Sequence, residues 1–219
     1  MTREDILRRC DHTLLKRDMS SADMKRVCDE AIEYKTASVC LPPHFVAPAR
    51  RYAGEDLVIC TVIGFPNGYS TTRAKCEEAR EAVKNGASEL DMVVNLPMLK
   101  DRFYQGIIDD INSVKAVCGE KILKVIIETC LLTEDEKITL CKLVSESGAE
   151  FVKTSTGFEK GGATREDIAL MRRYSAPHIR IKAAGGIATF EDAEDFILLG
   201  ADRLGTSRLV TLAKRDGSC

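Results

Sequence analysis

The sequence predicts a closed (β/α)8 barrel of the TIM-barrel class, formed by a single domain over residues 1–219. Short apolar runs alternate with helical segments along the whole chain, and no linker or shift in composition divides it. An open doubly wound sheet is the alternative that periodicity alone leaves open. Seven runs are clear strand candidates and an eighth, at the start, is weaker: 38–41, 57–63, 90–94, 122–127, 151–153, 179–182 and 203–204, with 10–15 as the weaker one.

Capping signals mark the ends of the helices between these runs. A Ser or Thr followed three residues later by an acid predicts a capping box at the start of a helix. Four such pairs occur: Ser20 with Asp23, Thr133 with Glu136, Thr164 with Asp167, and Thr189 with Asp192. Gly86, Gly148 and Gly200 stand where a left-handed residue would end a helix.

Two lysines lie near the ends of predicted strands that break into glycine, Lys153 in EFVKTSTG and Lys182 in IRIKAAGG. If the strands are neighbours, the side chains start roughly 4.8 Å apart. Two charges at that distance repel by about 3.5 kcal/mol at an effective dielectric of about 20. This repulsion lowers the pKa of one amine from ~10.4 to about 8. A cationic neighbour is one way to activate a Schiff-base lysine. The alternative is that either lysine extends out of the barrel and pairs with a carboxylate.

A repeat in the turns before the strands gives positional information. Three turns contain a Gly-Ala dipeptide, and in each a distinctive residue lies five positions after the glycine. The glycines and the residues that follow them are Gly86 and Asp91, Gly148 and Lys153, and Gly200 and Gly205. The same spacing without the glycine leads from Lys35 to Cys40. Because side chains alternate along a strand, a shared register predicts that these residues all point into one pocket. An accidental repeat of common Gly-Ala pairs is the alternative.

The amino-acid composition and charge predict which kinds of partner the protein binds and in which compartment it lies. Hydrophobic residues make up 44% of the 219 residues, which provides a sizeable core. The net charge of −2 predicts no nucleic-acid partner, and the lack of an apolar run of ~20 residues predicts no membrane partner. Nine cysteines without a secretion signal predict reduced thiols and a cytoplasmic location. Three separated histidines and no Cys-x-x-Cys spacing predict no metal site. The outer helices of a barrel are compatible with a homo-oligomer.

Four segments, in this order, resemble the deoxyribose-phosphate aldolase family: DHTLL at 11–15, ELDMVVN at 89–95, FVKTSTGF at 151–158 and KAAGGI at 182–187. The resemblance runs from about Ile6 to Leu209. It implies a class I aldolase on a (β/α)8 barrel, with no metal or other cofactor. The implied reaction is the reversible cleavage of a phosphosugar, 2-deoxy-D-ribose 5-phosphate, to acetaldehyde and D-glyceraldehyde 3-phosphate.

The resemblance also implies roles for four residues. Lys153 would be the Schiff-base nucleophile, and Lys182 the cation that keeps it neutral. Asp91 would carry protons through water, best with a pKa near the working pH. Asp11 would pair with the second lysine. The alternatives are a structural salt bridge for Asp91, and a helix cap or ordinary ion pair for Asp11.

Glycine-rich loops predict the phosphate site. Gly185 and Gly186 follow the seventh strand, and Gly205 and Ser207 follow the start of the eighth, where barrels commonly bind phosphate. Gly157 would close a third side. Some family members have a basic residue where this chain has Phe158, so Lys160 and Arg208 are the candidate charge partners.

The remaining candidates have weaker roles. We expect Cys40 to line the pocket without acting as a nucleophile. Thr154 and Thr156 contact the sugar hydroxyls or, alternatively, serve strand packing. His12 and His44 are expected to be structural. The tail at 214–219 lacks the tyrosine with which some members end. Two other functions stay open: another Schiff-base barrel enzyme, such as a transaldolase or a dehydratase, and a non-catalytic phosphosugar-binding protein.

Overall fold

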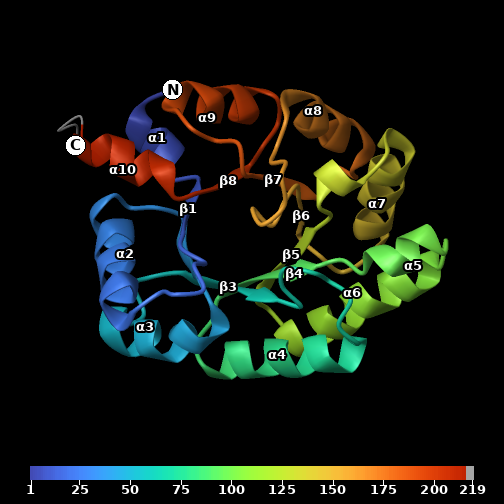
Figure 1. Ribbon diagram of the computed structural model, residues 1–219, viewed down its shortest axis with the longest axis horizontal. Coiled ribbons are helices and arrows are strands. Elements are labelled where there is room, and N and C mark those ends of the chain that lie inside the picture. Colours follow the sequence, from blue (N-terminus) through green and yellow to red (C-terminus); the bar gives the residue numbers. More distant parts are fainter. Residues whose placement is uncertain (216–219) are drawn as a thin grey trace.

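A computed structural model describes residues 1–215 of the chain. Eight parallel strands close into a barrel in sequential order, with helices in an outer ring, which confirms the predicted (β/α)8 fold (Figure 1). The strands are β1 (Cys10–Thr13), β2 (Ser38–Leu41), β3 (Ile59–Ile63), β4 (Glu89–Val93), β5 (Ile122–Ile126), β6 (Phe151–Lys153), β7 (Arg180–Ala184) and β8 (Arg203–Thr206). The helices are α1 (Arg3–Leu7), α2 (Ser21–Glu33), α3 (Val46–Ala53), α4 (Thr72–Lys84), α5 (Leu96–Lys100), α6 (Tyr104–Cys118), α7 (Glu134–Glu146), α8 (Arg165–Tyr174), α9 (Phe190–Leu198) and α10 (Arg208–Arg215), with 3-10 turns η1 (Pro43–Phe45) and η2 (Thr129–Leu131).

Each predicted strand overlaps a strand of the structure, and the two differ only in where the strand begins or ends. β2 and β6 match the predicted ranges. β7 and β8 extend two residues further than predicted, because Ala184 continues the ladder against Gly205 although both side chains are small. The small residues that suggest a strand end in the sequence are therefore still paired in the barrel.

Three of the four predicted capping boxes form, at Ser20, Thr133 and Thr189. The box at Thr164 was predicted wrongly: the hydroxyl caps α8, but the Asp167 carboxylate accepts from Lys137 at 2.6 Å instead of closing the box. Gly86 and Gly200 adopt the left-handed backbone that was predicted, with φ of 102° and 111°.

Gly148 does not adopt this conformation. Helix α7 ends on Ser147 in an extended conformation, and the N–H of Gly148 donates to Oδ1 of Asn112 at 2.8 Å. A side-chain acceptor on α6 therefore takes the place of a left-handed helix end.

The strands separate an apolar outer core from a polar interior. Outward residues such as Val39, Leu90 and Val152 are fully buried against the helices. Inward residues from alternate strands form layers, as is usual in such barrels. From the N-terminal end of the barrel upward, the layers are Ser38, Glu89, Phe151 and Arg203; Asp11, Cys60, Lys124 and Lys182; Cys40, Asp91, Lys153 and Gly205; and Thr13, Val62, Ile126 and Ala184.

The third layer contains the four residues that the repeated spacing predicted to point into one pocket. Their shared inward direction is confirmed, but only Lys153 and Gly205 line the cavity at the C-terminal end of the barrel. All four come from the even strands, β2, β4, β6 and β8. Atoms of Cys40 and Asp91 lie within 4.8 Å of each other, and Asp91 contacts Lys153 at 2.8 Å. A Cβ on Gly205 would meet the inward Lys182 side chain at 3.1 Å.

Candidate active site

Lys153 and Lys182 meet at one carboxylate oxygen. Nζ of Lys153 lies 2.8 Å from Oδ2 of Asp91, and Nζ of Lys182 lies 2.7 Å from the same atom. The two amines are therefore neighbours, as the sequence predicted. The sequence did not predict that a carboxylate would lie between them and offset part of their repulsion.

A third lysine, Lys124 on β5, completes the group and was missed by the sequence analysis. Its side chain is fully buried. Its Nζ lies 2.8 Å from Oδ1 of Asp91, 2.6 Å from Oε2 of Glu89 and 3.3 Å from Sγ of Cys60. A signal was available: a lysine in the middle of an apolar strand, directly in register with Asp91.

Asp11 anchors the other end of this network. Its carboxylate forms an ion pair with the Lys182 amine and accepts hydrogen bonds from Arg203 Nη1 at 2.6 Å and from the Ser38 hydroxyl at 2.8 Å. Arg203 also donates to Glu89 at 3.1 Å. Asp11 is thus in contact with the second lysine, and the arginine on β8, which sequence reasoning also missed, links it to Glu89.

Cations outnumber carboxylates inside the barrel. Four cationic side chains, Lys124, Lys153, Lys182 and Arg203, contact three carboxylates, Asp11, Glu89 and Asp91. Burial alone would lower the pKa of Lys182, but Asp11 and Asp91 raise it above its usual value. The same opposition raises the pKa of Lys124 well above its usual value. These two amines therefore stay charged, and Asp91 keeps both of them as partners in addition to Lys153.

Asp91 does not have the near-neutral pKa that was expected for a proton carrier. Burial would raise its pKa, but Lys124, Lys153 and Lys182 together hold it well below the ordinary range. Three amines within 2.8 Å stabilise the ionised form. In the free protein Asp91 is therefore a fixed negative charge.

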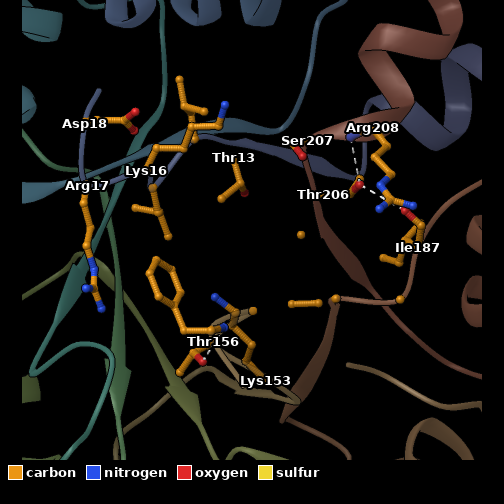
Figure 2. Close-up of a pocket in the computed structure, with 18 residues that line it drawn as sticks. Thr13, Lys16, Arg17, Asp18, Lys153, Thr156, Ile187, Thr206, Ser207 and Arg208 are labelled. Carbon is orange, nitrogen blue, oxygen red and sulfur yellow. Dashed lines mark hydrogen bonds between the residues drawn. The ribbon is translucent and has the colours of Figure 1, made fainter. Parts of the chain in front are cut away.

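A cavity of about 600 Å³ opens above Lys153 at the C-terminal end of the barrel (Figure 2). Six of the predicted substrate-binding residues line it: Thr156, Gly157, Gly185, Gly186, Gly205 and Ser207. Gly157, Gly185 and Gly186 have positive φ values of 84°, 74° and 75°, which strain any residue with a Cβ. Ser207 lies directly before α10, so the positive end of that helix adjoins the cavity.

Three exposed cations line the mouth of this cavity. Figure 2 shows Lys16 and Arg17 on one side and Arg208 on the other. Within residues 1–215 none of them makes an ion pair. Lys160, the other candidate charge partner, does not line the cavity, whereas Phe158 does. Lys16 and Arg17 were missed because they lie in a loop after the weakest predicted strand.

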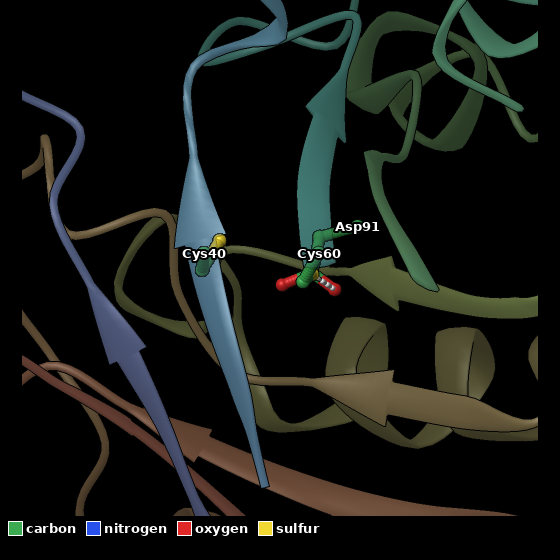
Figure 3. A group of neighbouring side chains, drawn as sticks. All are labelled: Cys40, Cys60 and Asp91. Atoms are coloured by element: carbon green, nitrogen blue, oxygen red, sulfur yellow. Dashed lines mark hydrogen bonds between the residues drawn. The ribbon is translucent and has the colours of Figure 1, made fainter. Parts of the chain in front are cut away.

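Thr154 and Cys40, two of the predicted substrate-binding residues, do not line the cavity. The Thr154 hydroxyl donates to O of Ala184 at 3.0 Å and accepts from its N–H at 3.0 Å, so it joins β6 to β7 and is fully buried. Cys40 is 1% exposed and lies beside Cys60 and Asp91 (Figure 3). None of the three lines the cavity. The side chains of Thr154 and Cys40 belong to the packed barrel and not to the surface of the cavity.

The Cys40, Cys60 and Asp91 group has the compactness of a metal site but not its electrostatics. Their ligand atoms lie within 4.8 Å of one another. However, Asp91 already accepts from three amines, and Lys124 also contacts Cys60. A divalent cation would be placed against these ammonium groups, which its charge opposes.

The two histidines lie outside the lysine network. His12 points outward from β1, and its Nε2 lies 2.6 Å from Oε2 of Glu30 on α2, so it is structural as predicted. His44 packs edge-to-face against Phe45 with the ring centroids 5.0 Å apart. The tail residues 216–219 lie outside the described part of the chain. Among the described helices, none is both long and apolar enough to cross a bilayer.

A family model described as DeoC/LacD family aldolase matches residues 6–199. The chain belongs to this family. It is 51% identical over 216 residues to the deoxyribose-phosphate aldolase of Clostridium botulinum (strain Alaska E43 / Type E3), covering 99% of this chain and 98% of that one. It is 50% identical over 215 residues to the deoxyribose-phosphate aldolase of Streptococcus pyogenes serotype M4, covering 98% and 96%.

A solved structure of deoxyribose phosphate aldolase from Aeropyrum pernix, described as a unique tetramer, aligns with a TM-score of 0.87 at 29% identity. The alignment covers 99% of this chain and 93% of that one. Sequence and fold therefore agree with the family over nearly the whole chain.

Proposed function

We propose that the chain is a class I aldolase that reversibly cleaves 2-deoxy-D-ribose 5-phosphate to D-glyceraldehyde 3-phosphate and acetaldehyde. One observation carries this proposal: Lys153 lies at the floor of a glycine-rich cavity, with its amine on a carboxylate that two charged lysines already neutralise. The curated relatives that bear this activity in their names, at 51% and 50% identity, support the choice of substrate.

The first step is formation of the Schiff base. The neutral amine of Lys153 attacks C1 of the open-chain sugar, and the carbinolamine loses water to give an iminium. Lys182 and Lys124 remain charged and hold Asp91 in place. Asp91 Oδ2, at 2.8 Å from the amine, stays ionised and is placed to stabilise the iminium and to orient the water that exchanges protons with it.

The second step breaks the carbon–carbon bond. A base removes the proton of the 3-hydroxyl, the C2–C3 bond breaks, and its electron pair moves into the iminium to form an enamine. D-Glyceraldehyde 3-phosphate leaves with C3 as its new aldehyde carbon. Protonation of the enamine at C2 restores an iminium, and water then releases acetaldehyde and the free Lys153 amine.

The phosphate end of the substrate fits the opposite part of the cavity. The backbone at Gly185, Gly186 and Gly205 allows close approach of an anion, and Ser207 adds a hydroxyl at the start of α10. We assign the charge partner to Arg208, with Lys16 and Arg17 adding to the positive field at the mouth. These cations take the place of the basic residue that some family members have at the position of Phe158.

Borohydride trapping tests the proposal. Reduction in the presence of acetaldehyde should leave an ethyl group on Lys153, located by peptide mass spectrometry, and the Lys153→Met variant should not be labelled. A non-catalytic phosphosugar-binding protein would give no adduct. An adduct on another lysine would overturn the mechanism, and an adduct on Lys153 without release of D-glyceraldehyde 3-phosphate would indicate another Schiff-base enzyme.

We also propose a cytoplasmic homo-oligomer that needs no metal and binds no nucleic acid. The described cysteines are free, which fits a reducing compartment. The tetramer of the Aeropyrum pernix relative and exposed apolar side chains such as Leu198, at 75%, support assembly. A single mass of 24.2 kDa in light scattering, the mass of one chain, would contradict the homo-oligomer. Loss of activity after dialysis against EDTA would contradict metal independence.

A further inference from the structure

Glu128 is a buried acid at the C-terminal end of the barrel that the mechanism above does not use. Among residues 1–215, three non-glycine residues have positive φ: Lys35, Arg102 and Glu128. The first two are exposed and directly follow the C-caps of α2 and α5, where a left-handed residue is ordinary. Glu128 has φ 53° and ψ 66°, is only 3% exposed and follows a strand. A strained residue of this kind persists only where its surroundings fix it, and such residues cluster at functional sites.

The conformation of Glu128 inserts an extra residue into the β5 side of the ladder. Ile127 N–H donates to O of Lys153 and Thr129 N–H donates to O of Thr154, each at 2.9 Å. A regular parallel ladder would take the second bond to O of Ser155. The bulge at Glu128 therefore turns its side chain toward the loop between β6 and α8.

The carboxylate of Glu128 binds that loop at Thr156. Its Oε2 accepts from the Thr156 N–H at 3.2 Å and also from the Thr156 hydroxyl. The hydroxyl oxygen in turn accepts from the N–H of Phe158 at 3.1 Å. Glu128 thus fixes the segment that begins three residues after Lys153.

These bonds decide what Thr156 can offer to a ligand. Thr156 lines the same cavity as Lys153. Its one hydroxyl hydrogen is donated to Glu128, so toward the cavity the oxygen can only accept. An acceptor there suits a substrate that carries hydroxyl donors, as a sugar does.

We propose that Glu128 is a positioning residue of the aldolase, which orders the loop after Lys153 and orients the Thr156 hydroxyl as an acceptor for a substrate hydroxyl. This inference rests on the proposed function. The far end of the loop is held separately, because a Cβ on Gly162 would lie 2.5 Å from C of Gly185 and Ala163 N–H donates to O of Ala184 at 3.0 Å. Loss of Glu128 should therefore release the near end of the loop without detaching the whole.

The Glu128→Gln variant tests this role with two substrates. The Thr156 N–H donates to both carboxylate oxygens, at 3.3 and 3.2 Å. The amide keeps the size of the side chain but removes its charge and replaces one of these acceptor oxygens with an NH2 donor. We expect kcat/KM for the phosphosugar to fall by about tenfold to a hundredfold, mainly through KM. Acetaldehyde has no hydroxyl, so borohydride trapping at Lys153 should proceed at the wild-type rate. Glu159→Gln, an exposed acid on the same loop, is the matched control and should change neither measurement.

A double-mutant cycle separates positioning from general damage. On a Thr156→Val background, Glu128→Gln should add no more than about a twofold loss for the phosphosugar. Fully additive losses, an unchanged KM in Glu128→Gln, or slowed acetaldehyde trapping in that variant would overturn the proposal. If Glu128→Gln does not fold, Thr156→Val alone decides, because it must weaken the phosphosugar reaction and spare the acetaldehyde adduct. Failure of wild-type trapping would instead overturn the proposed function itself.

Discussion

Lys153 and Lys182 are register partners on β6 and β7, and their amines lie 2.8 and 2.7 Å from the same oxygen of Asp91. The pair differs from two amines that simply repel each other. Lys182 also contacts Asp11, which keeps it charged, whereas Lys153 alone of the buried lysines lines the cavity. The difference between the two amines therefore comes from their partners and not from their distance alone.

Replacing Lys182 by Leu should move the activity to higher pH. The substitution removes a positive charge that shares Asp91 with Lys153, so the remaining negative charge favours the protonated form of the nucleophile. We expect the pH of half-maximal rate of acetaldehyde trapping to rise by roughly 1–3 units. Lys142→Leu, which removes an exposed lysine on α7, is the control. An unchanged pH profile would show that Lys182 does not tune Lys153.

Replacing Lys124 by Met should destabilise the fold as well as reduce activity. The change leaves Glu89 and Asp91 short of a buried cation, which costs about 3–5 kcal/mol of unfolding free energy. Urea denaturation measures this loss. The double variant Lys124→Met/Glu89→Gln should recover part of it, because one unpaired carboxylate is neutralised. A wild-type unfolding midpoint for Lys124→Met would contradict the contacts of this amine.

Arg208→Gln should weaken the use of phosphorylated substrate. Arg208 lines the cavity beside Ser207, so its loss removes a charge-assisted contact to the phosphate. We expect kcat/KM for 2-deoxyribose 5-phosphate to fall by about tenfold or more, with no change for unphosphorylated 2-deoxyribose. Lys160→Gln serves as the comparison, since this exposed lysine lies outside the cavity. Equal effects of the two variants would remove Arg208 as the charge partner.

Thr154→Val should change the stability of the fold and not KM, whereas Ser207→Ala should change KM and not the stability. The Thr154 hydroxyl makes two buried hydrogen bonds to Ala184, so its loss should lower the unfolding free energy by about 1–3 kcal/mol and leave KM almost unchanged. Ser207 is exposed at the cavity, so its replacement should raise KM for the phosphosugar without a change in the thermal midpoint. A large KM effect in Thr154→Val would restore Thr154 as a substrate contact.

The sequence predicted those site residues that a local signal marks. Lys153 and Lys182 stand before glycine-rich turns, and Asp91 lies at a repeated distance from a Gly-Ala turn. Thr154 and Thr156 are two residues apart in the same polar segment, and nothing local shows that Thr154 joins two strands while Thr156 lines the cavity. Glu128 gives no sequence signal at all, because its left-handed backbone is imposed by its surroundings.

By itself the sequence determined the alternation of strands and helices, because these signals are local and the apolar face of each strand requires a helix to cover it. The closure of the sheet into a barrel, where β1 pairs with β8, is a property of the tertiary structure. The sequence also determined the nucleophile candidate and the glycine loops. Only the tertiary structure decided which carboxylates each amine contacts, because the charged side chains come from six strands and meet across three adjacent layers of the barrel. The carboxylates that hold Lys182 and Lys124 charged, and the open cavity above Lys153, come together only when β1 closes on β8.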